Sequence, residues 1–229
     1  MQGTLCEIGL RTLKTKELIR MASRFGIFRE DVRKTNKEYY SLRDNKVNFY
    51  LIPGMNFIES IGSGKRDIYK MHDYKEVWTI GRFINRVKYY TVRELGKNFS
   101  RMPLELAWGD SDNEYKASMW VPEYISDDLF EVTMSDLGRK YDFVKDLSIS
   151  LIFRKERNCA QLLHFGEYNQ IESSKQYLLE GIYAEGFTPT GKLGEIFLNH
   201  PHCNPPDKLQ ILLRQEIADS KLKKAPDIT

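Results

Sequence analysis

The chain has 229 residues, of which 41% are hydrophobic and 12% aromatic, so it can bury a core and is not expected to be disordered. Its 35 basic and 32 acidic residues give a formal net charge of +3, which creates no electrostatic requirement for nucleic acid or membranes. Cys6, Cys159 and Cys203 lack metal-ligand spacing and are interpreted as reduced thiols. Because no long apolar run or signal-peptide pattern is present, we expect a cytoplasmic protein without a membrane partner.

The first 36 residues are expected to form a helical extension. Thr15 is a plausible N-cap and Gly26 a stop signal for one helix, and residues 28–34 predict a second, short helix. The favoured interpretation of this segment is a structural helix pair or a dimer arm, in a monomer or homodimer.

A helix-turn-helix is the alternative for the same segment, because Ala22, Gly26 and Val32 follow that motif's spacing. It would place three basic residues near DNA: Arg29, Arg33 and Lys34. Short patterns of this kind often arise by chance, so nucleic acid is an expected partner only under this alternative, through residues 15–35.

The centre of the chain has two similar halves, in which strand-forming runs alternate with one amphipathic helix. The first half predicts strands at residues 47–52, 57–61, 104–108 and 117–121 around a helix at 72–88. The second half predicts strands at residues 148–153, 159–164, 194–198 and 209–215 around a helix at 172–185. A connecting helix is expected to begin at Ser126, a typical N-cap followed by two aspartates.

These repeats predict an α+β fold, a two-layer sandwich of two pseudo-symmetric strand-helix-strand-strand units. Helices would cover one face of an antiparallel sheet and leave the other free to curve into a groove. We expect this domain to span residues 37–218 and residues 219–229 to form a flexible tail.

One carboxylate lies in the middle of an otherwise apolar predicted strand. Glu195 is flanked by Leu193 and Phe197 on its own strand face, because strand side chains alternate. Burying an unpaired carboxylate is costly, so Glu195 either faces water or lines a pocket for a cation or a proton transfer.

Several motifs support the second possibility. In chain order they are Tyr39-Tyr40-Ser41-Leu42 with the 52–58 segment, Met102–Trp108, Met119–Ile125, Leu163–Asn169 and the run from Lys192 to Arg214. Together, over about residues 37–218, they resemble the GyrI-like small-molecule-binding family. The resemblance implies a duplicated fold in which Glu195 accepts cationic, lipophilic drugs. It also implies two alternatives, because one branch hydrolyses spirocyclopropyl DNA-alkylating antibiotics and other members are fused to DNA-binding domains.

The expected pocket combines carboxylates with aromatic walls, which suit a planar cation. If the halves superpose, Glu105 and Glu195 occupy equivalent strands and both could face the cleft. The candidate walls are Trp108, Trp120, Tyr168 and Phe197. Core packing is the alternative for each tryptophan. Trp78 is expected in the core, Trp120 is the favoured wall, and strict alternation would turn Trp108 away from Glu105.

Arg82 and Trp78 stand where the family often has two tyrosines, and Arg82 could neutralise a pocket carboxylate. In an enzyme, Glu195 or Glu105 could act as the base and Tyr168 as the hydrogen-bond donor.

No cofactor or metal is expected. His200-Pro201-His202-Cys203 carries ligand atoms, but its tight spacing favours a structural loop. Gly62-Ser63-Gly64-Lys65 lacks the pattern of a phosphate-binding loop, and Cys159 lies in an apolar strand that disfavours a thiolate. The sequence therefore predicts a small-molecule binder that holds a lipophilic, planar or cationic compound, with a hydrolase and a ligand-responsive transcriptional regulator as alternatives.

Overall fold

The computed structural model describes residues 29–35, 37–40, 45–110 and 113–219. The expected helix from Thr15 to Gly26, Cys6 and the expected tail lie outside these residues, apart from residue 219. None of the helices within the described ranges combines the length and the apolarity needed to cross a membrane.

The described residues form an eight-stranded antiparallel sheet in the order β2-β8-β10-β9-β5-β6-β3-β7. Its strands are β2 (Asn48–Ile52), β3 (Met55–Ser63), β5 (Leu104–Trp108), β6 (Glu114–Val121), β7 (Ile149–Arg154), β8 (Arg157–Phe165), β9 (Phe187–Phe197) and β10 (Gln210–Asp219). All eight were predicted from the sequence.

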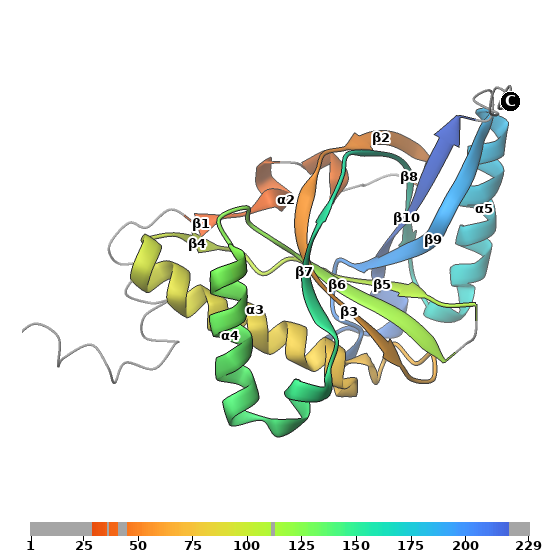
Figure 1. Ribbon diagram of the computed structural model, residues 1–229. Coiled ribbons are helices and arrows are strands. Elements are labelled where there is room, and N and C mark those ends of the chain that lie inside the picture. The colour runs from red at the N-terminus through yellow and green to blue at the C-terminus, as the bar shows by residue number, and fades with distance from the viewer. Residues whose placement is uncertain (1–28, 36, 41–44, 111–112, 220–229) are drawn as a thin grey trace, which may run out of the picture.

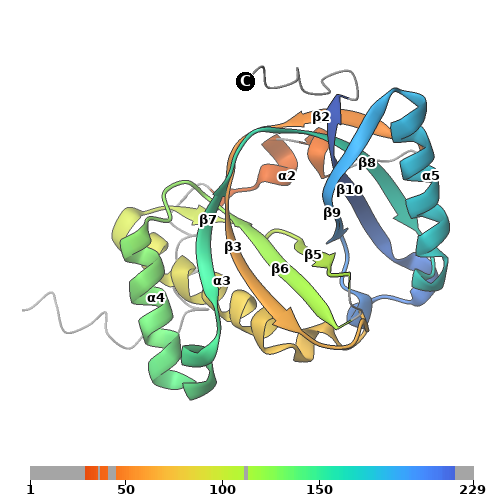
Figure 2. The ribbon, with the colours of Figure 1, turned by 45° about the vertical axis from the view of Figure 1, so that its right-hand side comes forward.

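The sheet contains the two expected repeats, because β3-β6-β5 and β8-β10-β9 have the same internal order and meet where β5 pairs with β9. The first strand of each repeat, however, pairs with the other repeat: β2 joins β8 and β7 joins β3. Residues 154–158 were therefore wrongly predicted to form a hairpin between paired strands. Figure 2 shows β7 continuing into β8 as a long curved ribbon between the two halves.

The helices form the second layer of the sandwich, which confirms the predicted α+β class (Figure 1). Helix α3 (Lys75–Leu95) packs on β3 and β6, α4 (Asp127–Lys140) packs on α3, and α5 (Ile171–Ala184) packs on β8 and β9. Helix α3 continues past the predicted end at Lys88 and stops at Gly96, whose φ of 60° is the left-handed conformation that glycine adopts without strain.

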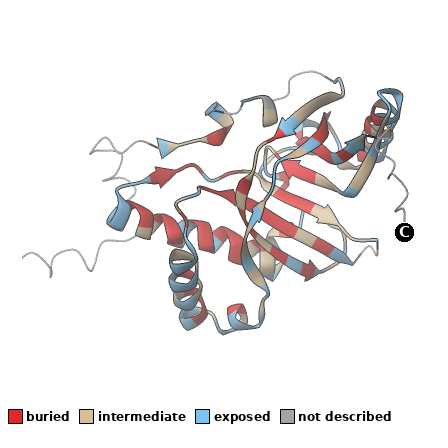
Figure 3. Ribbon diagram, turned by 45° about the horizontal axis from the view of Figure 1, so that its top comes forward, coloured by how far each residue is buried: buried red, intermediate tan, exposed pale blue. Residues whose placement is uncertain are grey.

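The core lies between these layers, where buried positions line the sheet and α3 (Figure 3). Apolar residues of α3 recur at helical spacing and pack on alternate residues of β3 and β6, which is why this part of the pattern was readable from sequence. Short 3-10 turns connect the elements: η1 (Lys37–Tyr39), η2 (Met71–Asp73), η3 (Asp142–Asp146), η4 (Tyr168–Gln170), η5 (Pro201–Cys203) and η6 (Pro206–Lys208).

The second expected N-terminal helix, over residues 28–34, differs from the structure. Strand β1 (Arg29–Glu30) pairs with β4 (Asn98–Phe99), and only α2 (Val32–Thr35) is helical. Val32 is buried in the core, and the guanidinium of Arg33 binds Asp31 at 2.9 Å instead of extending freely. This packing against the domain replaces the helix that the basic residues suggested.

Candidate ligand-binding site

Glu195 lies on β9, near the centre of the sheet, on the face covered by α5. It is paired with Leu106 of β5 and Leu213 of β10, and it has no exposed surface. The solvent-exposed interpretation of Glu195 is therefore wrong, and its charge must be matched inside the protein.

Four donors from four different elements converge on the Glu195 carboxylate. Oε1 accepts from Arg66 Nη2 at 2.8 Å and lies 3.0 Å from Lys175 Nζ. Oε2 accepts from the Tyr168 hydroxyl at 2.8 Å and from Trp108 Nε1 at 3.1 Å. An ionised carboxylate has about four lone-pair sites, so these contacts saturate it.

The guanidinium of Arg66 occupies the position expected for a planar cationic ligand. Its Cζ lies 5.5 Å from the ring centroids of both Trp108 and Tyr168, within cation–π range, while Nη2 binds Glu195. Its Nε also donates to the Tyr168 hydroxyl at 2.9 Å. A flat cation therefore lies on the Glu195 carboxylate between aromatic rings, and it is one of the protein's own side chains.

Electrostatics fix the protonation of this cluster. Burial, reinforced by the negative charge of Glu195, raises the pKa of Tyr168, so the phenol stays protonated and donates. Burial is the largest influence on Arg66 and would lower its pKa, but Glu195, Tyr168 and Glu172 together outweigh burial and raise that pKa. At the outer edge, Lys175 holds the pKa of Glu172 below its ordinary value.

The segment between β3 and α3, residues 64–74, carries Arg66 and is anchored to the rest of the domain. Ile68 and Met71, on either side of an exposed stretch, are buried in the core. The Tyr74 hydroxyl donates to the Lys65 carbonyl and lies 3.3 Å from the Asp67 carbonyl oxygen, which ties the segment to the start of α3. Arg66 therefore sits on a loop anchored at both ends.

Glu105 does not share this site, contrary to expectation. It pairs with Ile196, while Glu195 pairs with Leu106, so the two carboxylates are out of phase by one residue and face opposite sides of the sheet. On its own side Glu105 binds Arg154 at 3.1 Å and lies 3.5 Å from Arg214.

The remaining predicted residues are distributed differently from the expected cleft. Trp120 is buried edge-to-face with Phe99, at 6.4 Å between ring centroids, and pairs with Phe57 on the Glu105 face of the sheet. Phe197 shares the Glu195 face but packs in the core. Arg82 stacks over Trp78 at 4.9 Å and makes no ion pair with Glu195; Arg66 and Lys175 take that role.

Arg66 and Lys175 were not predicted as site residues. Arg66 follows a glycine-rich turn, which has no periodicity to reveal where a side chain points. Lys175 has one readable signal, its spacing three residues after Glu172 on a helix, with the two groups 2.9 Å apart.

No protein-family model and no curated protein matches the sequence. Among solved structures, an uncharacterized conserved protein from Listeria innocua is 20% identical, with a TM-score of 0.72, over 83% of this chain and 100% of that chain. A hydrolase from Listeria innocua is 21% identical, with a TM-score of 0.70 and the same coverage. EcmrR in a complex with DNA is 12% identical, with a TM-score of 0.51, over 89% of this chain and 68% of that chain.

The chain shares its fold with the two Listeria innocua proteins. At these identities the likeness establishes the fold alone. In this chain the central strand β9 carries a buried glutamate whose charge is matched by an arginine and a lysine.

Proposed function

We propose that the protein binds a planar, lipophilic cation at Glu195, in the place that Arg66 occupies. The observation that carries this proposal is the position of the Arg66 guanidinium, on the carboxylate and 5.5 Å from the centroids of two aromatic rings. A ligand with delocalised positive charge and a flat apolar body reproduces all of these contacts.

Exchange of one cation for another keeps the buried charge balanced. Glu195 retains Lys175 at 3.0 Å throughout, and the incoming ligand supplies the charge that Arg66 removes. Arg66 also has a second partner available, since Glu172 lies 3.4 Å from its Nη2 and is largely exposed. The released guanidinium would pair there, at the edge of the site.

Hydrolysis is the second candidate, supported by one observation. Glu195 and Tyr168, which would serve as base and donor, are within 2.8 Å of each other. With all four acceptor positions of Glu195 occupied and the Tyr168 proton committed, however, neither group is free to act on water or substrate. We therefore favour binding. DNA-linked regulation stays a prediction that depends on the N-terminal residues.

Removing the resident cation is expected to open the site. Arg66→Gln should tighten binding of ethidium, a planar lipophilic cation, by about tenfold, because the ligand no longer competes with a charge-assisted contact. Fluorescence titration measures this affinity. Glu195→Gln in the same background should abolish the gain.

Arg154→Gln is the matched control, because it makes the same substitution in a carboxylate-bound arginine on the opposite sheet face. It should leave ethidium binding unchanged. Equal ethidium affinity in the wild type and Arg66→Gln would contradict the proposal. Consumption of a spirocyclopropyl compound in many-fold excess over protein would instead establish the hydrolase.

A further inference from the structure

A second pocket, of about 500 Å³, lies between α3 and the ends of β5 and β9. Its volume is in the range of small-molecule sites. Its apolar surface includes Met71, Met102, Leu104 and Phe197, of which all but Leu104 are buried core residues. It is separate from Glu195, which is not among the residues that line it.

The charges around this pocket are all of one sign. Arg33, Arg82 and Arg101 line it together with His72 and His200, and no acidic residue is among the described residues on its wall. Asp31 matches Arg33, and Asp73 lies 3.3 Å from His72. Among the described residues, Arg82 and Arg101 have no carboxylate within ion-pair distance. Within the part of the chain that the structure describes, these two positive charges are therefore not compensated.

Arg101 is held against the pocket wall by a close approach to α3. A Cβ placed on Gly81 would lie 2.9 Å from Arg101 Nη2, so the guanidinium approaches the helix where the glycine leaves room for it. Gly81 is followed directly by Arg82, whose guanidinium is fixed over Trp78 at 4.9 Å. Both arginines thus line the same pocket, one against Gly81 and the other over Trp78.

His200 lies in the same positive field. Burial lowers the pKa of His200, and the nearby His72, Arg101 and His202 lower it further. The rings of His72 and His202 are tilted by 43° to each other, with centroids 4.6 Å apart. The region is thus one where a negative charge would be stabilised.

We propose that this pocket binds an amphiphilic organic anion, with its carboxylate, sulfonate or phosphate on Arg82 and Arg101 and its apolar body against Met71, Met102 and Phe197. Arginine presents a planar fork of donors that fits such oxyanions. The chemistry is the opposite of that at Glu195, and the inference does not depend on the function proposed for that site.

The test uses two fluorescent probes with a shared ring system, anilinonaphthalene sulfonate and uncharged phenylnaphthylamine. Arg101→Gln should weaken binding of the sulfonate about tenfold, since it removes a charge-assisted contact, while leaving the uncharged probe unaffected. Arg82→Gln should act in the same direction. Because Arg82 and Arg101 are exposed, neither change should unfold the protein. Added salt should also weaken binding of the sulfonate, as exposed charges are screened.

Two controls separate this pocket from the other charged sites. Arg154→Gln, on the opposite sheet face, and Glu195→Gln should leave sulfonate binding unchanged. The proposal is overturned if the arginine variants weaken both probes equally, if they weaken neither, or if Arg154→Gln weakens sulfonate binding as much as Arg101→Gln.

Discussion

At the scale of single residues, the protein buries two carboxylates on one pair of neighbouring strands and matches each with cations. Glu195 is bound by Arg66 and Lys175, and Glu105 by Arg154 and Arg214. An ionised carboxylate left unpaired at either position would cost several kcal/mol. The cationic partners come from other segments of the chain, so each ion pair holds separate segments together in the folded protein.

His164 is a further buried polar residue with a measurable consequence. Its Nε2 lies 3.1 Å from the carbonyl oxygen of Glu167, which only accepts, so Nε2 carries the proton and Nδ1 accepts from Ser174 Oγ at 2.8 Å. Burial lowers its pKa in the folded state. The folded protein therefore favours neutral His164.

We expect stability to fall as pH decreases below about 6.5, the pKa of an unfolded histidine, until the lower folded pKa is reached. Above that range both states are neutral and His164 adds no pH dependence. Urea unfolding between pH 7 and pH 5 measures this slope, which should be shallower in His164→Asn. An unchanged slope in the variant would assign the loss to other groups, of which His200 also has a lowered pKa.

At the scale of elements, α4 shows how far local sequence determines structure. The helix begins after Ser126, as predicted, with Ser126 Oγ accepting from the Leu129 amide at 3.3 Å and two aspartates in the first turn. No tertiary contact is needed to explain this end. By contrast, the segment that carries Arg66 takes its course from Ile68 and Met71, which pack into a core contributed by other elements.

Removing the α4 cap should therefore have a local cost. Ser126→Ala is expected to lower the free energy of unfolding by about 1 kcal/mol, because one amide at the helix start loses its partner. Ser126→Asp should retain most of the stability, since its carboxylate can accept the same bond. Urea denaturation provides both values, and equal stability of Ser126→Ala and wild type would show that the cap contributes nothing.

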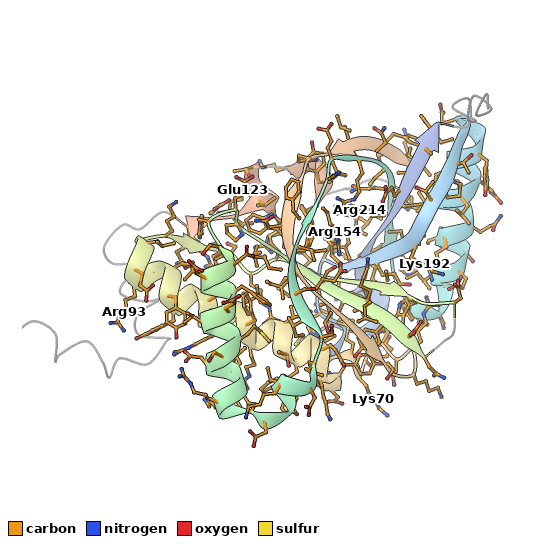
Figure 4. The ribbon with its side chains drawn as sticks, viewed as in Figure 1. Lys70, Arg93, Glu123, Arg154, Lys192 and Arg214 are labelled. Atoms are coloured by element: carbon orange, nitrogen blue, oxygen red, sulfur yellow. The ribbon has the colours of Figure 1, made fainter. Side chains whose placement is uncertain are left out.

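At the scale of the whole molecule, the curved sheet separates two charged clusters. The first surrounds Glu195 on the face covered by helices, and the second surrounds Glu105 on the opposite face. The face opposite the helices carries a pocket of about 550 Å³, lined by Glu59, Glu105, Arg154 and Arg214. Figure 4 shows Arg154 and Arg214 at the strands that arch over this side. Arg154 Nη2 binds Glu59 at 2.7 Å and Ser118 Oγ at 2.7 Å, so these charges largely compensate one another.

We expect this second cluster to support stability and not binding at Glu195. Glu105→Gln should lower the free energy of unfolding by about 3 kcal/mol, because buried Arg214 loses its carboxylate, while ethidium affinity in the Arg66→Gln background stays the same. Lys116→Gln, which removes an exposed contact to Glu59 at 3.6 Å, should change stability by less than about 1 kcal/mol. If Glu105→Gln also lost ethidium binding, Glu105 and Glu195 would act in one site, which would contradict this expectation.

The amino-acid sequence by itself indicated the eight strands of the large sheet, the helices α3, α4 and α5, and the duplication. These features depend on neighbours only a few residues away in the sequence. Examples are the alternation of apolar residues in the strands, the helical spacing of Ile80, Ile84 and Val87, and the cap at Ser126. The sequence also singled out Glu195, Tyr168 and Trp108, which the structure brings together.

Only the tertiary structure decided how those elements pair and which charges meet. The exchange of β2 and β7 between the repeats and the one-residue offset between Glu105 and Glu195 are properties of strand register, which long-range pairing sets. The same holds for Arg66, 129 residues from Glu195 along the chain. Local patterns cannot encode such partners, because the free energy that selects them comes from burying a charge between segments that meet only in the folded protein.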